Sequence, residues 1–304
     1  MEYLHNKFGG IDMKFYNVFS GFLTGKTKEY YQRNIGDRKF NSLHSYWYLK
    51  DLSDEKIQEG FNMTKGNIMI DSGAYTAWNN DIEIDCDKYI KFINKWHVYI
   101  TTFGQIDVIP PKRATREQIN ECCQRTWNNY LYMTDNVICP EKILYTFHYG
   151  EDLKWLKQAL EYRDKNGKPI EYMALGGLVG RSTRQRIFFL NRCFGLIKQS
   201  SNPNIKVHGF GVSTEKLWRR YSFESCDSFS PGMKTNLESE KASIYVTDGY
   251  ERIFKPRGWT IKDKIVTPEA DTLKIEENIR AEEKVKLLIK NIEYWDNLAN
   301  SIKR

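Results

Sequence analysis

The feature that most constrains the fold is a repeated alternation between short apolar runs and longer segments with helical periodicity. Each apolar run has the length of a strand, and most are followed by a helix-length segment or a loop. This pattern predicts a parallel sheet of βα units, either closed into a (β/α)8 barrel or open as a doubly wound sheet. The predicted strands are Phe15–Phe22, Leu43–Tyr48, Ile68–Asp71, Phe103–Ile109, Ile143–Phe147, Tyr172–Leu175, Lys206–Phe210 and Glu224–Phe229.

Distinctive polar residues and glycines stand at the carboxyl ends of several of these strands. In a closed barrel those ends meet at one mouth, whereas in an open sheet they are strung along an edge. This placement favours the (β/α)8 barrel. The residues concerned are Asp71, Asp107, His148, Gly176, Gly177 and Asp227.

Several of the intervening helices have recognisable first residues. Asp85 is an expected N-cap ahead of an apolar helical face, and Ser182 precedes a long helical pattern. Thr115 is followed three residues later by Gln118, which is the spacing of a capping box. These signals predict helices that begin shortly after positions 85, 115 and 182.

The predicted barrel occupies residues 1–232. Residues 233–304 differ in character and are predicted to form a C-terminal extension packed on the barrel. Its first part, 234–264, is turn-rich and basic with interleaved aromatic residues, and 271–302 has the pattern of a helix.

Composition narrows the class of protein further. The chain has 40% hydrophobic and 28% charged residues, which is typical of a globular protein. It has no run of about 20 apolar residues, and its first residues are charged, so we expect a cytoplasmic protein with no membrane partner.

Six scattered cysteines without a C-x-x-C pair predict neither a disulfide framework nor a structural zinc site. The net charge of +7 favours a polyanionic partner.

Three carboxylates at one mouth predict a reaction at a sugar carbon. One carboxylate can attack the anomeric centre and form a covalent glycosyl-enzyme, while another moves protons to and from the leaving group. Taken singly, each aspartate is more typical of a turn or a cap, and only the three together favour a shared site. Gly73 and the Gly176-Gly177 pair allow a flat heterocycle to approach the backbone, and Tyr75 and Tyr149 are candidates for stacking on it.

Basic residues cluster just beyond the candidate strand ends. Such clusters predict contacts to a phosphate backbone, although scattered arginines are also typical of a solvated surface. The candidates are Lys112, Arg113, Arg116, Arg181, Arg184, Arg186, Arg219 and Arg220.

The motifs resemble, in order and approximate spacing, those of the guanine transglycosylases. The matching runs are Asp71-Ser72-Gly73-Ala74-Tyr75, Ala174-Leu175-Gly176-Gly177-Leu178-Val179-Gly180, His208-Gly209-Phe210-Gly211 and Cys226-Asp227-Ser228. These enzymes exchange guanine in nucleic acid for a 7-deazaguanine base. The residues found in these motifs are similar to those of the phage and bacterial branch that modifies DNA. The resemblance covers about residues 15–232.

The resemblance implies a role for each matched residue. Asp227 would be the nucleophile, and Asp71 the general acid and base toward the outgoing and incoming bases. Asp107 would bind the base edge, and His148 with the backbone of Gly177 and Leu178 would complete the pocket, to which Ser72, Gly73, Tyr75, Tyr149 and Gly176 also belong. His148 stands where the tRNA enzymes have glutamine, so the identity of the accepted base is open.

The resemblance also implies which partners to expect. The tRNA enzymes carry a zinc cluster after the nucleophile strand, but no cysteine follows Cys226 here, so we expect no zinc subdomain, metal or redox cofactor. The expected activity replaces guanine in DNA with a free 7-deazaguanine similar to preQ0, in the host cytoplasm if the gene belongs to a phage. The alternatives are the same exchange on tRNA, hydrolysis of the N-glycosidic bond, and a binding protein without chemistry. A homodimer or an accessory protein is left open.

Overall fold

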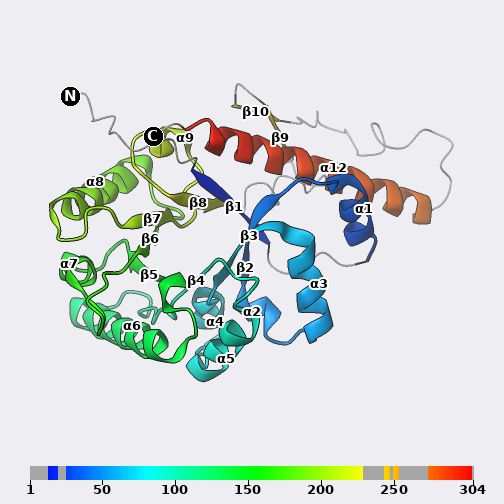
Figure 1. The fold of residues 1–304 in the computed structure, drawn as a ribbon. Helices are drawn as coiled ribbons and strands as arrows, with labels where there is room; N and C mark the ends of the chain where they lie inside the picture. The colour runs from blue at the N-terminus through cyan, green and yellow to red at the C-terminus, as the bar shows by residue number, and fades with distance from the viewer. Residues whose placement is uncertain (1–12, 20–24, 229–242, 247–248, 253–272, 303–304) are drawn as a thin grey trace.

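Eight parallel strands form a closed barrel in the order of the chain, from β1 to β8 (Figure 1). The computed structural model describes residues 13–19, 25–228, 243–246, 249–252 and 273–302. The predicted (β/α)8 barrel is therefore confirmed, and the open sheet is excluded. The strands are β1 (Lys14–Phe19), β2 (Phe40–Ser45), β3 (Lys65–Asp71), β4 (Thr102–Gly104), β5 (Ile143–His148), β6 (Tyr172–Gly176), β7 (Lys206–Gly209) and β8 (Ser225–Ser228).

Helices and short turns connect the strands and surround the barrel (Figure 1). The predicted caps at Asp85, Thr115 and Ser182 are confirmed, the last two as full capping boxes. The elements are α1 (Gly25–Ile35), α2 (Tyr46–Leu49), α3 (Asp54–Thr64), α4 (Ala74–Asn79), α5 (Cys86–Trp96), α6 (Arg116–Asn136), η1 (Pro140–Lys142), α7 (Leu153–Glu161), α8 (Thr183–Gln199) and α9 (Glu215–Trp218).

Alternation along the strands divides the apolar residues between two cores. Tyr16, Leu43, Met69 and Leu144 form a small buried cluster, which occupies the barrel interior. Their strand neighbours belong to a much larger cluster between the barrel wall and the helices. Residues two or four positions apart along a strand face the same side, so Asp71 and His148 lie on the interior face, above Met69 and Leu144.

Two predicted strands end earlier than expected. The second ends at Ser45, because Tyr46 begins the short helix α2. The fourth ends at Gly104, so Asp107 lies in the loop that follows β4 rather than in the strand. The apolar residues after Gly104 are buried as loop, which periodicity alone cannot distinguish from strand.

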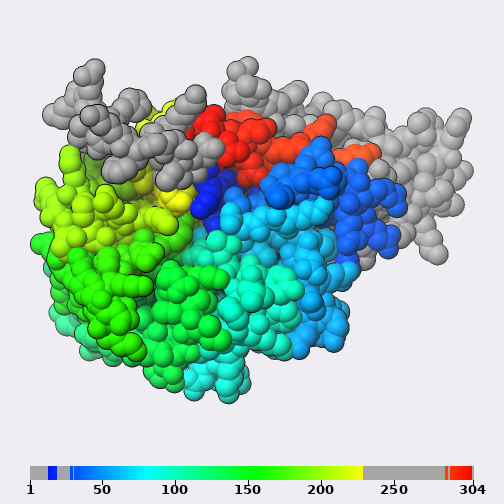
Figure 2. Space-filling model, viewed as in Figure 1, coloured from blue at the N-terminus to red at the C-terminus, as the bar shows by residue number. Residues whose placement is uncertain are grey.

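The last helix, α12 (Leu273–Asn300), shares the hydrophobic core of the barrel. Its Trp295 stacks on Phe15 of β1 with ring centroids 5.2 Å apart and meets Trp218 of α9 edge-on at the same distance. In the space-filling view α12 lies along the N-terminal elements that it covers (Figure 2). The predicted terminal helix is therefore present and packs on the barrel.

The basic segment 234–264 is described only in part. Two short antiparallel strands, β9 (Ser243–Val246) and β10 (Gly249–Arg252), lie within it. The rest of this segment falls outside the described residues. No helix in the described ranges has both the length and the apolar character needed to cross a bilayer.

Candidate active site

The barrel brings Asp71, Asp107 and Asp227 into one electrostatic group. Asp71 is the last residue of β3, and Asp227 is the third residue of β8. Burial, together with the charges of Asp107 and Asp227, raises the pKa of Asp71 to about 6 against the hydrogen bond from Gly73. Such repulsion requires nearby carboxylates. Three side chains distant in the sequence therefore face the same mouth.

The carboxylate of Asp227 is held by one of its two oxygens. Its Oδ1 accepts a hydrogen bond from the backbone N–H of Gly211 at 2.8 Å and lies 3.1 Å from Nε2 of His208. Within the described residues Oδ2 accepts no hydrogen bond, and the side chain is 9% exposed. Asp227 is therefore buried and oriented, with one oxygen available to a ligand.

Asp107 belongs to a charged chain that continues to Glu151. Nε2 of His148 lies 3.4 Å from Oδ2 of Asp107, and Nδ1 lies 3.1 Å from Oε1 of Glu151. Gln105 also donates to Oδ1 of Asp107 at 3.2 Å. Burial alone would lower the pKa of His148, but the two carboxylates outweigh it and raise this pKa well above its usual value.

Each ring nitrogen of His148 therefore has a carboxylate partner, which favours the protonated imidazole. The ring lies against Asp107, and the resemblance implied that His148 helps to complete the base pocket. Glu151 and Gln105 are functional candidates that the sequence analysis missed. The available signal was local, because Glu151 follows His148 by three residues and Gln105 precedes Asp107 by two.

Two glycines allow the backbone to come close to this site. Gly73 has φ +79°, and its N–H donates to Oδ2 of Asp71 at 3.0 Å. A Cβ at Gly73 would lie 2.7 Å from Cβ of Trp47, and a Cβ at Gly176 would lie 2.7 Å from Cδ2 of His148. The second glycine of the pair, Gly177, also has a positive φ, +70°. The predicted glycine turns therefore allow Asp71 and His148 to lie close to the backbone.

Gly176→Ala is expected to displace His148 from its position between the two carboxylates. The added methyl would overlap the imidazole, so the pKa of His148 should fall toward its ordinary range. An NMR titration of the histidine ring measures this directly. Gly195→Ala on α8 is the matched control, because a Cβ there meets nothing within 4 Å. An unchanged His148 titration in Gly176→Ala would contradict the geometry.

The remaining predicted pocket residues differ in how far they are buried. Ser72 is buried, and its Oγ accepts from the N–H of Ala74 at 3.4 Å. Leu178 is fully buried in the main core. Tyr75 is 68% exposed and stacks on Trp78, so it is accessible at the rim.

Two basic residues at the rim lie over aromatic rings. Arg181 is 4.7 Å from the ring centroid of the half-buried Tyr149, and Lys112 is 5.7 Å from that of Trp78. Three further candidates are exposed near the same strand ends, namely Arg113, Arg116 and Arg184. This part of the predicted basic rim is therefore on the surface.

Of the other basic candidates, Arg219 and Arg220 contact residues of the same chain, and Arg186 is partly buried. Arg219 pairs with Glu215 at 2.7 Å. Arg220 bonds Asn191, in the middle of α8, at 3.4 Å, so it lies in the outer helical layer. Arg186 is half-buried, and its Nε has no hydrogen-bond partner among the described residues.

Asp71→Asn is expected to stabilise the protein at neutral pH. A carboxyl whose pKa is raised in the folded state favours folding when protonated, so stability falls as pH rises between 3.8 and about 6 and stays lower above that. The amide removes this penalty, which is about 2 to 3 kcal/mol. Urea unfolding at pH 4 and pH 7.5 should show a gain at the higher pH only. Asp51→Asn, at a side chain 80% exposed, should show neither effect.

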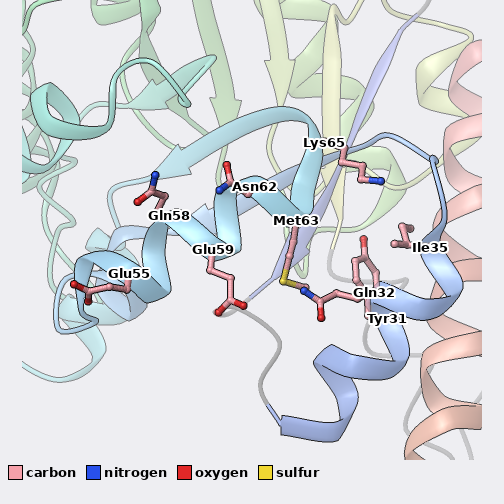
Figure 3. Close-up of a pocket in the computed structure, with 9 residues that line it drawn as sticks. All are labelled: Tyr31, Gln32, Ile35, Glu55, Gln58, Glu59, Asn62, Met63 and Lys65. Carbon is pink, nitrogen blue, oxygen red and sulfur yellow. The ribbon is translucent and has the colours of Figure 1, made fainter.

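A hollow of about 530 Å³ lies away from this site, on the flank between α1 and α3 (Figure 3). None of the predicted site residues lines it. Its lining combines acidic, amide and apolar side chains: Tyr31, Gln32, Ile35, Glu55, Gln58, Glu59, Asn62, Met63 and Lys65. The flank hollow and the mouth are therefore separate features of the barrel.

Comparison with known proteins adds information about the fold alone. No family model and no curated protein matches the chain. Among solved structures it is similar to a protein described as a fructose-1,6-biphosphate aldolase from Coccidioides immitis, with a TM-score of 0.53 and 8% identity. The match covers 96% of this chain and 90% of that one. It supports the barrel fold and leaves the reaction to be argued from the site.

The described residues contain no group of three or more histidine, cysteine or acidic side chains arranged to hold a metal ion. The groups that the mouth offers are carboxylates, one imidazole, an amide and backbone N–H groups. Such a set can supply a nucleophile, a proton donor and acceptors for a ligand's N–H groups.

Proposed function

We propose that the protein exchanges guanine in DNA for a free 7-deazaguanine base through a covalent intermediate on Asp227. The observation that carries this proposal is the state of two carboxylates at the mouth, Asp227 and Asp71. Asp227 is buried with Oδ1 hydrogen-bonded and with no hydrogen bond to Oδ2 from the described residues, while Asp71 has a pKa of about 6 in the same group. One carboxylate is thus suited to attack and the other to carry a proton.

The first half-reaction makes one bond and breaks another. Oδ2 of Asp227 attacks C1′ of the deoxyribose, the C1′–N9 bond breaks, and protonated Asp71 gives its proton to the departing guanine. In the second half, Asp71 takes the N9 proton of the incoming base, whose N9 attacks C1′ and releases Asp227. Every atom is conserved, and Asp71 ends protonated as it began.

Asp107 and Gln105 are the groups that fit the edge of the base. Guanine and its 7-deaza analogues present N1–H and an amino group side by side, which a carboxylate can accept together. Oε1 of Gln105 is buried and lacks a hydrogen-bond partner in the described part of the chain, so it is a second acceptor. A buried acceptor without a donor is costly, and a ligand N–H would relieve that cost.

The exposed rim supports a nucleic acid as the macromolecular substrate. Lys112 and Arg181 offer positive charge, and Tyr75 and Tyr149 offer ring faces near them. Charge binds phosphates, and exposed rings stack unpaired bases. Because a base inside a duplex is out of reach, the target base must be flipped or single-stranded.

The decisive experiment is base exchange measured with labelled guanine in two polymers. Single-stranded DNA, duplex DNA and tRNA carrying labelled guanine are each incubated with the protein, with and without a free 7-deazaguanine. We expect release of label from DNA that requires the free base. Release from tRNA alone would support the tRNA alternative, and base-independent release leaving abasic sites would support a hydrolase. No release from either polymer would contradict the proposal.

A further inference from the structure

Three side chains outside the predicted site form a hydrogen-bonded line that ends on Asp227. The hydroxyl of Tyr172 on β6 lies 2.5 Å from Oγ of Ser225 on β8, and that Oγ lies 2.5 Å from Nδ1 of His208 on β7. Nε2 of His208 then lies 3.1 Å from Oδ1 of Asp227. The line crosses three adjacent strands below the mouth.

The donor and the acceptor of each hydrogen bond in this line can be assigned from the groups involved. Asp227 Oδ1 is an acceptor, so Nε2 of His208 carries the hydrogen that points at it. Nδ1 can then accept the hydroxyl hydrogen of Ser225, which accepts in turn from Tyr172. Each group in the line thus donates one hydrogen bond in the direction of Asp227.

Packing holds the histidine at the centre of this line in place. His208 is fully buried. Its ring meets Tyr16 edge-on with centroids 6.1 Å apart and Phe210 at 4.6 Å. A Cβ at the adjacent Gly209 would lie within 3.0 Å of Cys226 Sγ, so β7 and β8 are tightly packed here. The imidazole therefore has little freedom to rotate away from Asp227.

We propose that His208, held by Ser225 and Tyr172, is a positioning residue that selects Oδ2 of Asp227 as the attacking oxygen. This inference rests on the proposed function of Asp227. With His208 and the Gly211 N–H both bonded to Oδ1, the nucleophilic lone pairs of Oδ2 face the mouth. Once the glycosyl ester forms at Oδ2, Oδ1 becomes its carbonyl oxygen, and the same donors make Asp227 a better leaving group in the second half-reaction.

The test compares two replacements of His208, one that can donate a hydrogen bond to Asp227 and one that cannot. Phenylalanine keeps a ring in the buried site without a donor, whereas the glutamine amide can still donate toward Oδ1. We expect His208→Phe to slow formation of the covalent adduct and its discharge by about 10²-fold or more, with KM for the free base changed less than about threefold. His208→Gln should recover most of the rate.

A matched control separates this role from stability. His44 is also a buried histidine, bonded to Ser42 at 2.8 Å, but it lies on β2 facing Phe61 in the outer helical layer. His44→Phe should leave the rate per folded molecule unchanged. Equal losses in His44→Phe and His208→Phe would indicate general destabilisation and overturn the proposal.

The tautomer gives a measurement that does not depend on activity. Nitrogen NMR of wild-type His208 should show that Nε2 carries a proton and that Nδ1 does not. Ser225→Ala should change the chemical shift of Nδ1. A protonated Nδ1 in the wild type would overturn the proposed line. Wild-type protein without base exchange would overturn the proposed function, whereas a His208→Phe variant exchanging at the wild-type rate would overturn only the positioning role.

Discussion

Asp227→Asn is expected to reduce base exchange on the order of 10⁴-fold or more, because an amide is not a nucleophile toward C1′. The substitution is nearly isosteric. The amide oxygen can still accept the hydrogen bonds that Gly211 and His208 direct at Oδ1. The loss should therefore appear in the chemistry rather than in folding.

Two measurements check this prediction. Mass spectrometry of the protein after incubation with substrate DNA, without free base, should detect a covalent adduct in the wild type and none in Asp227→Asn. The thermal midpoint shows whether the variant is folded. Asp51→Asn, an exposed surface carboxylate, is the matched control and should form the adduct normally. An adduct in Asp227→Asn would assign the nucleophile to another residue.

The two half-reactions are expected to respond to pH in opposite directions around pH 6. Burial and the charges of Asp107 and Asp227 raise the pKa of Asp71 to about 6. Adduct formation needs the protonated form, so its rate should fall about tenfold for each pH unit above this pKa. Discharge by the incoming base needs the ionised form, so its rate should rise with pH and then level off. Because the ester removes the charge of Asp227, this rate should level off at a lower pH than the pKa of Asp71 in the free enzyme.

Single-turnover kinetics can measure each half separately. Adduct formation is followed without free base, and discharge is followed by adding base to preformed adduct at several pH values. Asp71→Asn can neither give nor take the proton, so both rates should drop by about 10² to 10⁴-fold and lose this pH dependence. A pH profile retained in Asp71→Asn would show that another group carries the proton. The same variant should be more stable than the wild type at pH 7.5, which is the behaviour of a residue kept for chemistry.

The local features of the fold were readable from the sequence. Hydrophobic periodicity located the strands that end at Asp71 and His148, and cap chemistry located the helix starts at Thr115 and Ser182. These signals depend on residues within a few positions of one another. The loop after Gly104 was read as strand because a short apolar run is ambiguous when its backbone is not seen.

The contacts that organise the site were not readable in this way. Glu151 and Gln105 acquire a role only because β4 and β5 are neighbours and turn their ends toward each other. His208 acquires its role because β7 lies between β6 and β8. Such pairings join residues far apart in the chain, and no local pattern in the chain encodes them.

The sequence by itself determined the order of strands and helices, and it placed an acidic residue at or just beyond the ends of β3, β4 and β8, because periodicity and capping act over a few residues. Only the tertiary structure decided that the sheet closes, that His148 lies between Asp107 and Glu151, and that His208 and Gly211 both contact the same oxygen of Asp227. The physical reason is that pKa shifts and hydrogen-bonded lines depend on distances of a few ångströms between strands, and barrel closure sets those distances.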